Sequence, residues 1–246
     1  MATHPHPLYG SRSRTCPYLG GREERTVMAE LTGDHSQDLY DHAIRAGFRR
    51  SHNFIYRPAC PGCDACQPVR VDAQNFSPTR SLSRVDRTNA DLLAVETQPQ
   101  ASEEQYRLFT QYQTKRHPGG GMDAMSMDEF RLMMESSPLA SFAVQFRDPD
   151  GILQGVMLAD EISDGLSAVY SFFDPDQKKR ALGTFMILWL IDACKRRGLP
   201  YLYLGYRIPG YAKMAYKARF QPMEVLGPDG WAQLPPDPVI DKKQAV

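Results

Sequence analysis

LSAVYSFFDPDQKKRALGT, residues 166–184, is the stretch that decides the fold of this chain. The apolar run 166–173 predicts a strand, and residues 182–197, which end at Gly198, predict a largely buried helix. A basic run, Lys178-Lys179-Arg180, lies between them. A strand that leads into a helix N-terminus presents unpaired backbone N–H groups and the positive end of the helix dipole. The junction is therefore predicted to bind an anion.

The neighbouring segments extend this unit on both sides. Residues 201–204 predict the next strand, and residues 210–217 predict a further helix that leads to Arg219-Phe220. Upstream, three apolar segments separated by turns predict an antiparallel meander at 141–147, 152–160 and 166–173. This order resembles the acyl-donor half of the acetyltransferase-like fold. We therefore expect an α/β (α+β) protein with a mixed sheet flanked by helices.

Length and composition indicate one main domain with an appendage. A chain of 246 residues can bury one good core and a small satellite unit. Residues 1–75 predict a loop-rich, cysteine-bearing N-terminal unit, residues 76–235 an acetyltransferase-like domain, and residues 236–246 a flexible tail. The apolar runs are far too short to span a bilayer, and the N-terminus lacks an apolar signal-peptide core. We expect a cytoplasmic protein without a membrane partner.

The charges balance in total but are segregated along the chain. There are 29 basic and 29 acidic residues. Residues 91–176 carry 5 basic and 15 acidic side chains, whereas residues 177–219 carry 10 basic side chains and only Asp192. A concentrated basic region attracts phosphates whatever the overall charge, so a polyanion is a plausible partner. For residues 195–197 alone, the alternative is that they complement the dipole of their own helix.

Four of the five cysteines lie in the N-terminal unit, at Cys16, Cys60, Cys63 and Cys66. A Cys-x-x-Cys turn places two thiolates on one side of a tight loop, as zinc and iron–sulfur sites require. These four residues are therefore candidate ligands for a structural zinc ion or iron–sulfur cluster. The alternative is that they stay reduced and only pack. Cys194 lies on the apolar face of its helix and is expected in the core.

Motifs spread over residues 8–231 resemble the bacterial aspartate/glutamate leucyltransferases, which are relatives of the arginyl-tRNA-protein transferases. They are CPYL at 16–19, FRRS at 48–51, YRPACPGCDACQPVR at 56–70, RHPGGGM at 116–122, FDP at 173–175, RALGT at 180–184 and LGYRIPGYAKMAYK at 204–217. The resemblance implies transfer of leucine from leucyl-tRNA to the N-terminal Asp or Glu of a protein, which marks that protein for degradation. It is the resemblance that chooses leucine over arginine as the donor amino acid.

An aminoacyl ester is already activated, so this chemistry requires no cofactor. The enzyme has to align amine and ester, stabilise an oxyanion and protonate the departing ribose oxygen. By analogy with acetyltransferase-like folds we expect Tyr216 to donate that proton; the alternative is that it only covers the sheet. The other residues assigned to the tRNA and its aminoacyl group are Arg180, Leu182, Gly183, Thr184, His117, Lys213 and Lys217. His117 could equally satisfy a turn.

An acceptor that begins with Asp or Glu needs a cation beside its carboxylate, and a guanidinium can bind a carboxylate through two hydrogen bonds. The candidates flank the cysteines and are Arg49, Arg50, Arg57 and Arg70, with none singled out.

Two other functions compete with aminoacyl transfer. The first is an acetyl-CoA-dependent N-acetyltransferase, in which Arg180 and Gly183 cradle a pyrophosphate. The second is a non-enzymatic zinc and nucleic-acid-binding module.

Overall fold

A mixed sheet of eight strands forms the centre of the protein, whose computed structural model describes residues 7–234. The strand order is β14-β13-β7-β12-β11-β10-β9-β8, and only β11 and β12 are parallel neighbours. The strands are β7 (Gln67–Asp72), β8 (Leu93–Thr97), β9 (Ser141–Arg147), β10 (Leu153–Ile162), β11 (Gly165–Phe173), β12 (Tyr201–Arg207), β13 (Met223–Gly227) and β14 (Gly230–Gln233). The expected mixed sheet with its antiparallel meander is confirmed.

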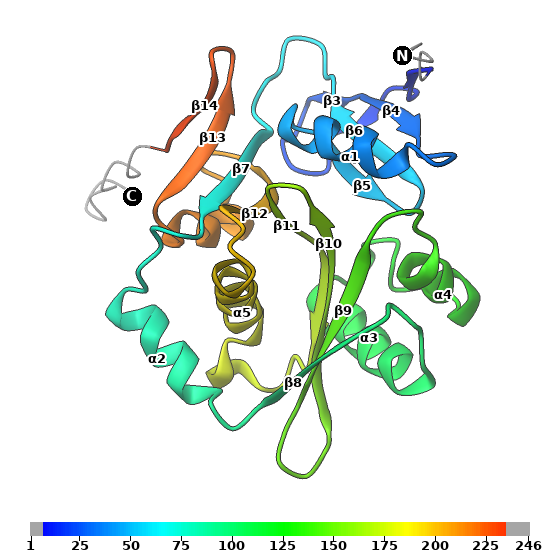
Figure 1. Cartoon of the computed structure of the whole chain (residues 1–246). Coiled ribbons are helices and arrows are strands. Elements are labelled where there is room, and N and C mark those ends of the chain that lie inside the picture. The colour runs from blue at the N-terminus through cyan, green and yellow to red at the C-terminus, as the bar shows by residue number, and fades with distance from the viewer. Residues whose placement is uncertain (1–6, 235–246) are drawn as a thin grey trace, which may run out of the picture.

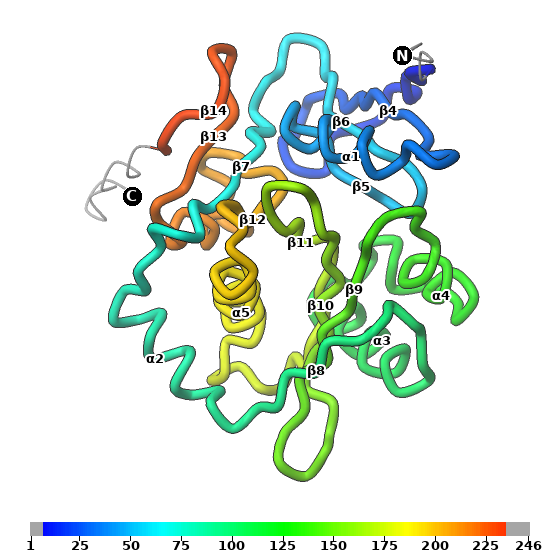
Figure 2. Tube along the Cα trace, viewed as in Figure 1, coloured from blue at the N-terminus to red at the C-terminus, as the bar shows by residue number. Residues whose placement is uncertain are grey.

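Helices cover both faces of this sheet. Figure 1 shows α2 (Arg80–Thr88) and α5 (Leu182–Arg196) on one side, and α3 (Glu103–Arg116) and α4 (Met127–Glu135) on the other. The trace in Figure 2 shows how α2 carries the chain past α5, from β7 to the far sheet edge at β8. Two separate hydrophobic cores result, one under each pair of helices.

Helix α5 is the most deeply buried helix that the structure describes. Its side chains Leu182, Met186, Leu190 and Ile191 are each at most 1% exposed, and burial of each stabilises the fold by about 1.5–3 kcal/mol. Because almost every side of the helix is apolar, it fits only between the sheet and a second layer, which α2 supplies. Cys194 is fully buried in this core, as expected.

The N-terminal unit is built on a smaller sheet with the order β1-β4-β6-β5. Its elements are β1 (Tyr9–Gly10), β2 (Arg14–Thr15), β3 (Glu23–Glu24), β4 (Thr26–Glu30), α1 (Ser36–Arg45), β5 (Arg49–Ser51) and β6 (Phe54–Pro58). Strand β7, which lies within the expected N-terminal unit 1–75, pairs with β12 and β13 of the large sheet. The small sheet ends with β6, and the division at residue 75 stays a prediction. The expected tail, 236–246, lies outside the described residues.

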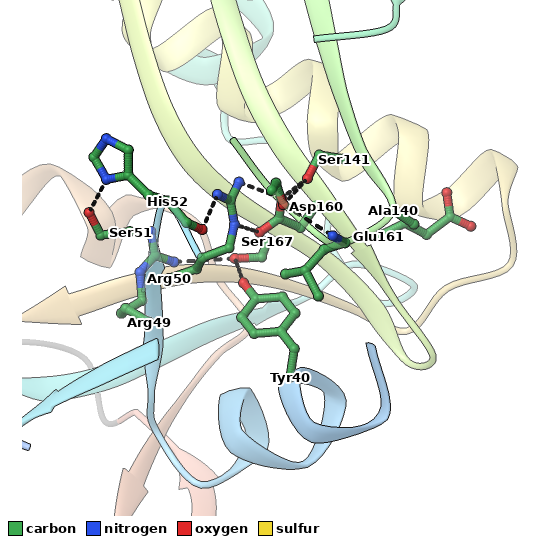
Figure 3. Close-up of polar contacts among 12 residues, drawn as sticks. Tyr40, Arg49, Arg50, Ser51, His52, Ala140, Ser141, Asp160, Glu161 and Ser167 are labelled. Carbon is green, nitrogen blue, oxygen red and sulfur yellow. Dashed lines mark hydrogen bonds and ion pairs between the residues drawn. The ribbon is translucent and has the colours of Figure 1, made fainter. Parts of the chain in front are cut away.

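A buried ion pair fastens the N-terminal unit to the large sheet (Figure 3). Arg50 on β5 donates from Nε and Nη2 to the two carboxylate oxygens of Asp160 on β10, each at 2.7 Å. Both side chains are at most 1% exposed. Ser141 donates to the same carboxylate, and Arg50 also donates to the carbonyl of His52. The pair is therefore fully hydrogen-bonded, which a charge pair removed from water requires.

Replacement of one partner of this pair is expected to leave an unpaired buried charge. Arg50→Ala should lower the free energy of unfolding by about 3–5 kcal/mol. Arg131→Ala, which removes the exposed partner of Asp128, should change it by about 0.5 kcal/mol or less. Urea unfolding monitored by circular dichroism measures both values. Equal losses in the two variants would contradict the role of the buried pair.

Candidate active site

The parallel strands β11 and β12 separate from each other partway along their length. They are paired only at Gly165–Ser167 and Tyr201–Tyr203, after which each strand continues without the other. A bulge in β11 places Val169 between the residues that pair with Leu158 and Ala159 of β10. Separated strands leave backbone N–H and C=O groups without ladder partners, and such groups must find other ones. This opening is where the candidate site lies.

Arg49 enters the opening from the N-terminal unit. Its Nη2 donates to the carbonyl of Ala168 on β11 at 2.6 Å, and Nη1 lies 3.4 Å from Oγ of Ser167. The guanidinium rests on Gly205 of β12, where a Cβ atom would lie 2.9 Å from Nε and 3.0 Å from Cζ of Arg49. Gly205 also has a φ of +74°, which favours glycine. The absence of a side chain at Gly205 is thus what admits Arg49.

Lys217 reaches the same opening from the other side, on the short helix η2 (Ala212–Arg219). Its Nζ donates to the carbonyl oxygens of Leu204 and Tyr206 on β12, at 2.8 and 2.5 Å. Burial, together with the charge of Arg49, lowers the pKa of Lys217 to about 7. The two carbonyl acceptors act in the opposite direction, because they favour the charged amine. Two cations therefore share one opening, and one of them titrates near neutral pH.

A cavity of about 440 Å³ lies between these strands, α3 and η2. That volume is within the range of about 300–1,000 Å³ typical of small-ligand sites. One part of its wall is apolar and is formed by Met122, Met157, Val169, Ile187 and Leu204. Another part carries the two cations, Arg49 and Lys217. Among the described residues that line the cavity there is no Asp or Glu.

Helix α3 contributes an aromatic wall to this cavity. Tyr112 packs against His117, with ring centroids 5.4 Å apart, and His117 Nε2 lies 3.4 Å from the Tyr112 hydroxyl. Gln113 donates from Nε2 to the hydroxyl of Tyr170 on β11. Burial raises the pKa of Tyr170 to about 12. Burial also lowers the pKa of His117, and the charges of Lys213 and Arg116 lower it further. These phenols stay protonated and His117 is mostly neutral near pH 7.

The structure brings three of the predicted tRNA and catalytic residues into this cavity: His117, Tyr216 and Lys217. Tyr216 is 41% exposed at the cavity rim, and partial burial raises its pKa, so its hydroxyl keeps its proton at neutral pH. Lys213 does not line the cavity, but it lies close enough to lower the pKa of His117. The proton-donor role of Tyr216 stays a prediction.

Arg180 and the N-terminus of α5 lie outside the cavity lining. Arg180 donates from both Nη atoms to the carboxylate of Asp91, at 2.8 Å each, so a phosphate would have to compete with Asp91. Leu182 is buried in the core, and a Cβ on Gly183 would lie 3.1 Å from the Phe173 ring. The N–H of Thr184 already donates to the carbonyl of Ala181 at 2.9 Å, which leaves the N–H groups of Leu182 and Gly183 and the Thr184 hydroxyl to meet an anion. The anion-binding role of this junction stays a prediction.

The structure separates the four candidate acceptor arginines. Of the four, Arg49 alone lines the cavity, whereas the guanidinium of Arg50 is buried in its ion pair with Asp160. Arg70 donates to Glu224 at 2.7 Å and stacks over the rings of Tyr201 and Trp231. Arg57 is exposed and donates to the carbonyl of Ala46. Because their guanidinium groups already have partners elsewhere, Arg50 and Arg70 are poor candidates for binding a substrate.

The cysteine cluster lies apart from the cavity. All four thiols are free. Burial, together with charge on Cys60, Cys16 and Cys63, raises the pKa of the Cys66 thiol to about 11. Within residues 7–234, however, no three His, Cys, Asp or Glu side chains are arranged to hold a metal ion. The structural zinc ion or iron–sulfur cluster stays a prediction.

Several residues of the cavity have no motif in the sequence. Tyr112, Gln113 and Met157 belong to elements whose periodicity indicates only core packing. For Tyr170, the sequence offered one signal of a place in the cavity, namely the small residues Ala168 and Ser171 near it in a strand of otherwise bulky residues.

Comparisons with known proteins identify relatives of this chain. Two family models match the chain, Arginine-tRNA-protein transferase, N terminus, over residues 14–84 and Arginine-tRNA-protein transferase, C terminus, over residues 104–227. An aspartate/glutamate leucyltransferase of Paramagnetospirillum magneticum is 50% identical over 232 residues, which cover 94% of this chain and 95% of the relative. One of Rhodospirillum rubrum is 46% identical over 228 residues, covering 92% and 93%. Among solved structures, L-PGS from Bacillus licheniformis has a TM-score of 0.47 at 12% identity, covering 61% of this chain and 49% of that chain.

The two family models and the named relatives define an enzyme of the aminoacyl-transferase class. The chain belongs to the arginine-tRNA-protein transferase family. No helix among residues 7–234 is both long enough and apolar enough to cross a membrane.

A methyl group at Gly205 is expected to displace Arg49. Gly205→Ala should lower the free energy of unfolding by more than the roughly 1–3 kcal/mol that a left-handed backbone costs an ordinary residue. Gly33→Ala is the matched control, because Gly33 has a φ of +77° but nothing within 4 Å of the new Cβ. Urea unfolding measures the difference. Combining Gly205→Ala with Arg49→Gln should recover part of the free energy of unfolding that Gly205→Ala loses. If the losses of the two single variants simply add in the double variant, the contact is refuted.

Proposed function

We propose that this enzyme transfers leucine from leucyl-tRNA to the N-terminal Asp or Glu of acceptor proteins and so marks them for degradation in the cytoplasm. The observation that carries the proposal is the cavity between β11 and β12, which combines an apolar wall with two cations and, among its described lining residues, no carboxylate. The names of the relatives support it.

The composition of the cavity favours leucine over arginine as the donor amino acid. A leucyl side chain can bury itself against Met157, Ile187 and Leu204, and burial of a leucine side chain stabilises binding by about 1.5–3 kcal/mol. An arginyl guanidinium would instead meet Arg49 and Lys217, with no described carboxylate in the wall to pair with it. An unpaired buried charge is strongly unfavourable.

The two cations suit the acidic side chain of the acceptor. A carboxylate placed between Arg49 and Lys217 would neutralise a pair of charges that repel each other in the empty cavity. The guanidinium of Arg49 is held in place by Ala168 and Gly205, so little entropy is lost when a carboxylate binds. Of the four predicted acceptor arginines we therefore assign acceptor recognition to Arg49, and we add Lys217.

With both substrates bound, the neutral α-amine of the acceptor attacks the ester carbonyl carbon of the leucyl group. The new C–N bond forms and the C–O bond to the ribose breaks. As donors to the oxyanion we propose backbone N–H groups of β11 near the bulge at Val169, beyond the point where β12 stops pairing with β11. Tyr216 protonates the departing ribose oxygen and is reprotonated by the proton that the attacking amine releases. No cofactor takes part.

The function is tested by incubating the protein with leucyl-tRNA or arginyl-tRNA and with peptides that begin with Asp, Glu, Arg or Ala. We expect leucine on the Asp and Glu peptides only, detected as a mass increase of one leucyl residue. Arginine on the same peptides would contradict the donor assignment. Acetyl-CoA without tRNA is the control for the competing acetyl transfer, and we expect no product from it.

The acceptor site predicts a preference that depends on pH. An N-terminal Asp peptide should react about ten- to a hundredfold faster than its Asn counterpart, because a charge-assisted hydrogen bond contributes about 1.5–3 kcal/mol. Since Lys217 loses its charge as the pH rises through about 7, this ratio should fall between pH 6.5 and 8.5. The Asp carboxylate raises the pKa of its own α-amine relative to that of the Asn peptide, so each rate is divided by the fraction of neutral amine before the ratio is taken. His117 is mostly neutral over this range.

Variants separate the two cations in this experiment. Lys217→Arg stays charged throughout and should make the ratio independent of pH. Arg49→Gln should lower the ratio at every pH, whereas Arg57→Gln, outside the cavity, should leave it unchanged. A ratio near one for the unmodified protein would exclude the proposed acceptor site.

A further inference from the structure

Helix α2 presents a row of arginines to solvent on the side opposite its buried face. Arg80, Arg84 and Arg87 are all exposed, whereas Leu82 and Asn89 of the same segment are fully buried. The spacing i, i+4, i+7 places the three side chains within about 60° of one another around the helix and over about 10 Å of its length. We call these three residues the α2 arginine row.

The arginine row is not needed to balance charge within the fold. Among the residues that the structure describes, its three guanidinium groups have neither an ion-pair nor a hydrogen-bond partner. By contrast, Arg131 pairs with Asp128, and Arg147 pairs with Glu104. The acidic residue of α2, Asp86, lies toward α5, where it lines a groove beside Asp192. The row is therefore a set of free positive charges.

Both ends of α2 touch segments that lead to the functional regions of the enzyme. At its start, Arg219 of η2 reaches Oγ of Ser81 at 3.5 Å, and Arg219 lies two residues after Lys217 of the cavity. At its end, Asn89 donates to the carbonyl of Arg180 at 2.8 Å, next to the exposed Lys178 and Lys179. The α2 arginine row therefore lies between η2, which carries the cavity residue Lys217, and the basic residues Lys178 and Lys179 before α5.

We propose that the α2 arginine row binds the phosphate backbone of the acceptor stem of the donor tRNA while the aminoacyl end lies in the cavity. The inference rests on the proposed function and assigns it a substrate-binding surface. Guanidinium groups at fixed intervals along a rigid helix suit phosphates along a duplex, and proteins recognise duplex RNA mostly through its shape and its backbone. Residues 91–176, with 15 acidic and 5 basic side chains, repel the same polyanion. The contact is therefore restricted to the side of the molecule that carries α2.

The test compares two triple variants of the full chain. One is Arg80→Gln/Arg84→Gln/Arg87→Gln; the control, Arg107→Gln/Lys115→Gln/Arg131→Gln, removes the same charge from α3 and α4. Glutamine preserves helix propensity, and circular dichroism verifies folding. The donors are full leucyl-tRNA and a short leucyl-oligonucleotide that ends in CCA and has no acceptor stem.

With full leucyl-tRNA at about 0.15 M salt, the row variant should show a KM raised about tenfold or more, with kcat little changed. The dependence of log KM on log salt should lose about two to three units of slope, near one for each phosphate contact removed. With the short donor, the row variant and the unmodified protein should react equally, and the control variant should behave like the unmodified protein with both donors.

An unchanged KM and an unchanged salt slope with full tRNA would overturn the proposal. An equal loss of activity with the short donor would overturn it as well, because the arginine row would then act on the reacting end of the donor or on the fold. Failure of the proposed function is a different result: the unmodified protein would transfer no leucine at all. In that case, fluorescence-anisotropy binding of uncharged tRNA still decides the matter. Weaker binding by the row variant alone would support the surface, and equal binding by all three proteins would refute it.

Discussion

The separation of β11 from β12 is the constraint on which the site depends. Two parallel strands that part inside a protein leave carbonyl groups that must be hydrogen-bonded, because an unpaired buried polar group costs about 1–3 kcal/mol. Here Arg49 bonds to Ala168 on one strand, and Lys217 bonds to Leu204 and Tyr206 on the other. The groups that complete the sheet are therefore cations. The same two side chains therefore complete the hydrogen bonds of the sheet and give the cavity its positive charge.

The N-terminal unit positions one of these two cations. Strand β5 places Arg50 and Arg49 next to each other, and neighbouring side chains of a strand point to opposite faces. Arg50 forms the buried pair with Asp160, while Arg49 enters the opening between the strands (Figure 3). Tyr40 of α1 adds a hydrogen bond to Ser167. The buried pair thereby fixes the register of a second arginine that lines the cavity, so the N-terminal unit contributes a residue to the candidate site.

Local sequence predicted the elements well because their signals are local. Residues 182–197 have almost no polar face, and Ser126 with Glu129 forms a capping box that the structure confirms. Local sequence did not predict that β7, inside the expected N-terminal unit, joins the large sheet, because its partners β12 and β13 lie more than a hundred residues downstream. The sequence identified four arginines for the acceptor, yet only tertiary pairing shows that Arg50 and Arg70 are occupied.

The sequence by itself determined the class of fold, the order of its elements and the membership of the family. Hydrophobic periodicity, turn residues and spaced motifs depend on residues that are close together in the chain, so they can be recognised without the tertiary structure. The tertiary structure alone decided where the cavity lies and which cations face it. Arg49 is far from Gly205 and Lys217 in the chain, and it is the parting of β11 from β12 that brings Arg49 onto Gly205 and into the cavity that Lys217 also lines. Burial decided the chemistry as well, since a lysine surrounded by sheet and arginine titrates near neutral pH and one in water does not.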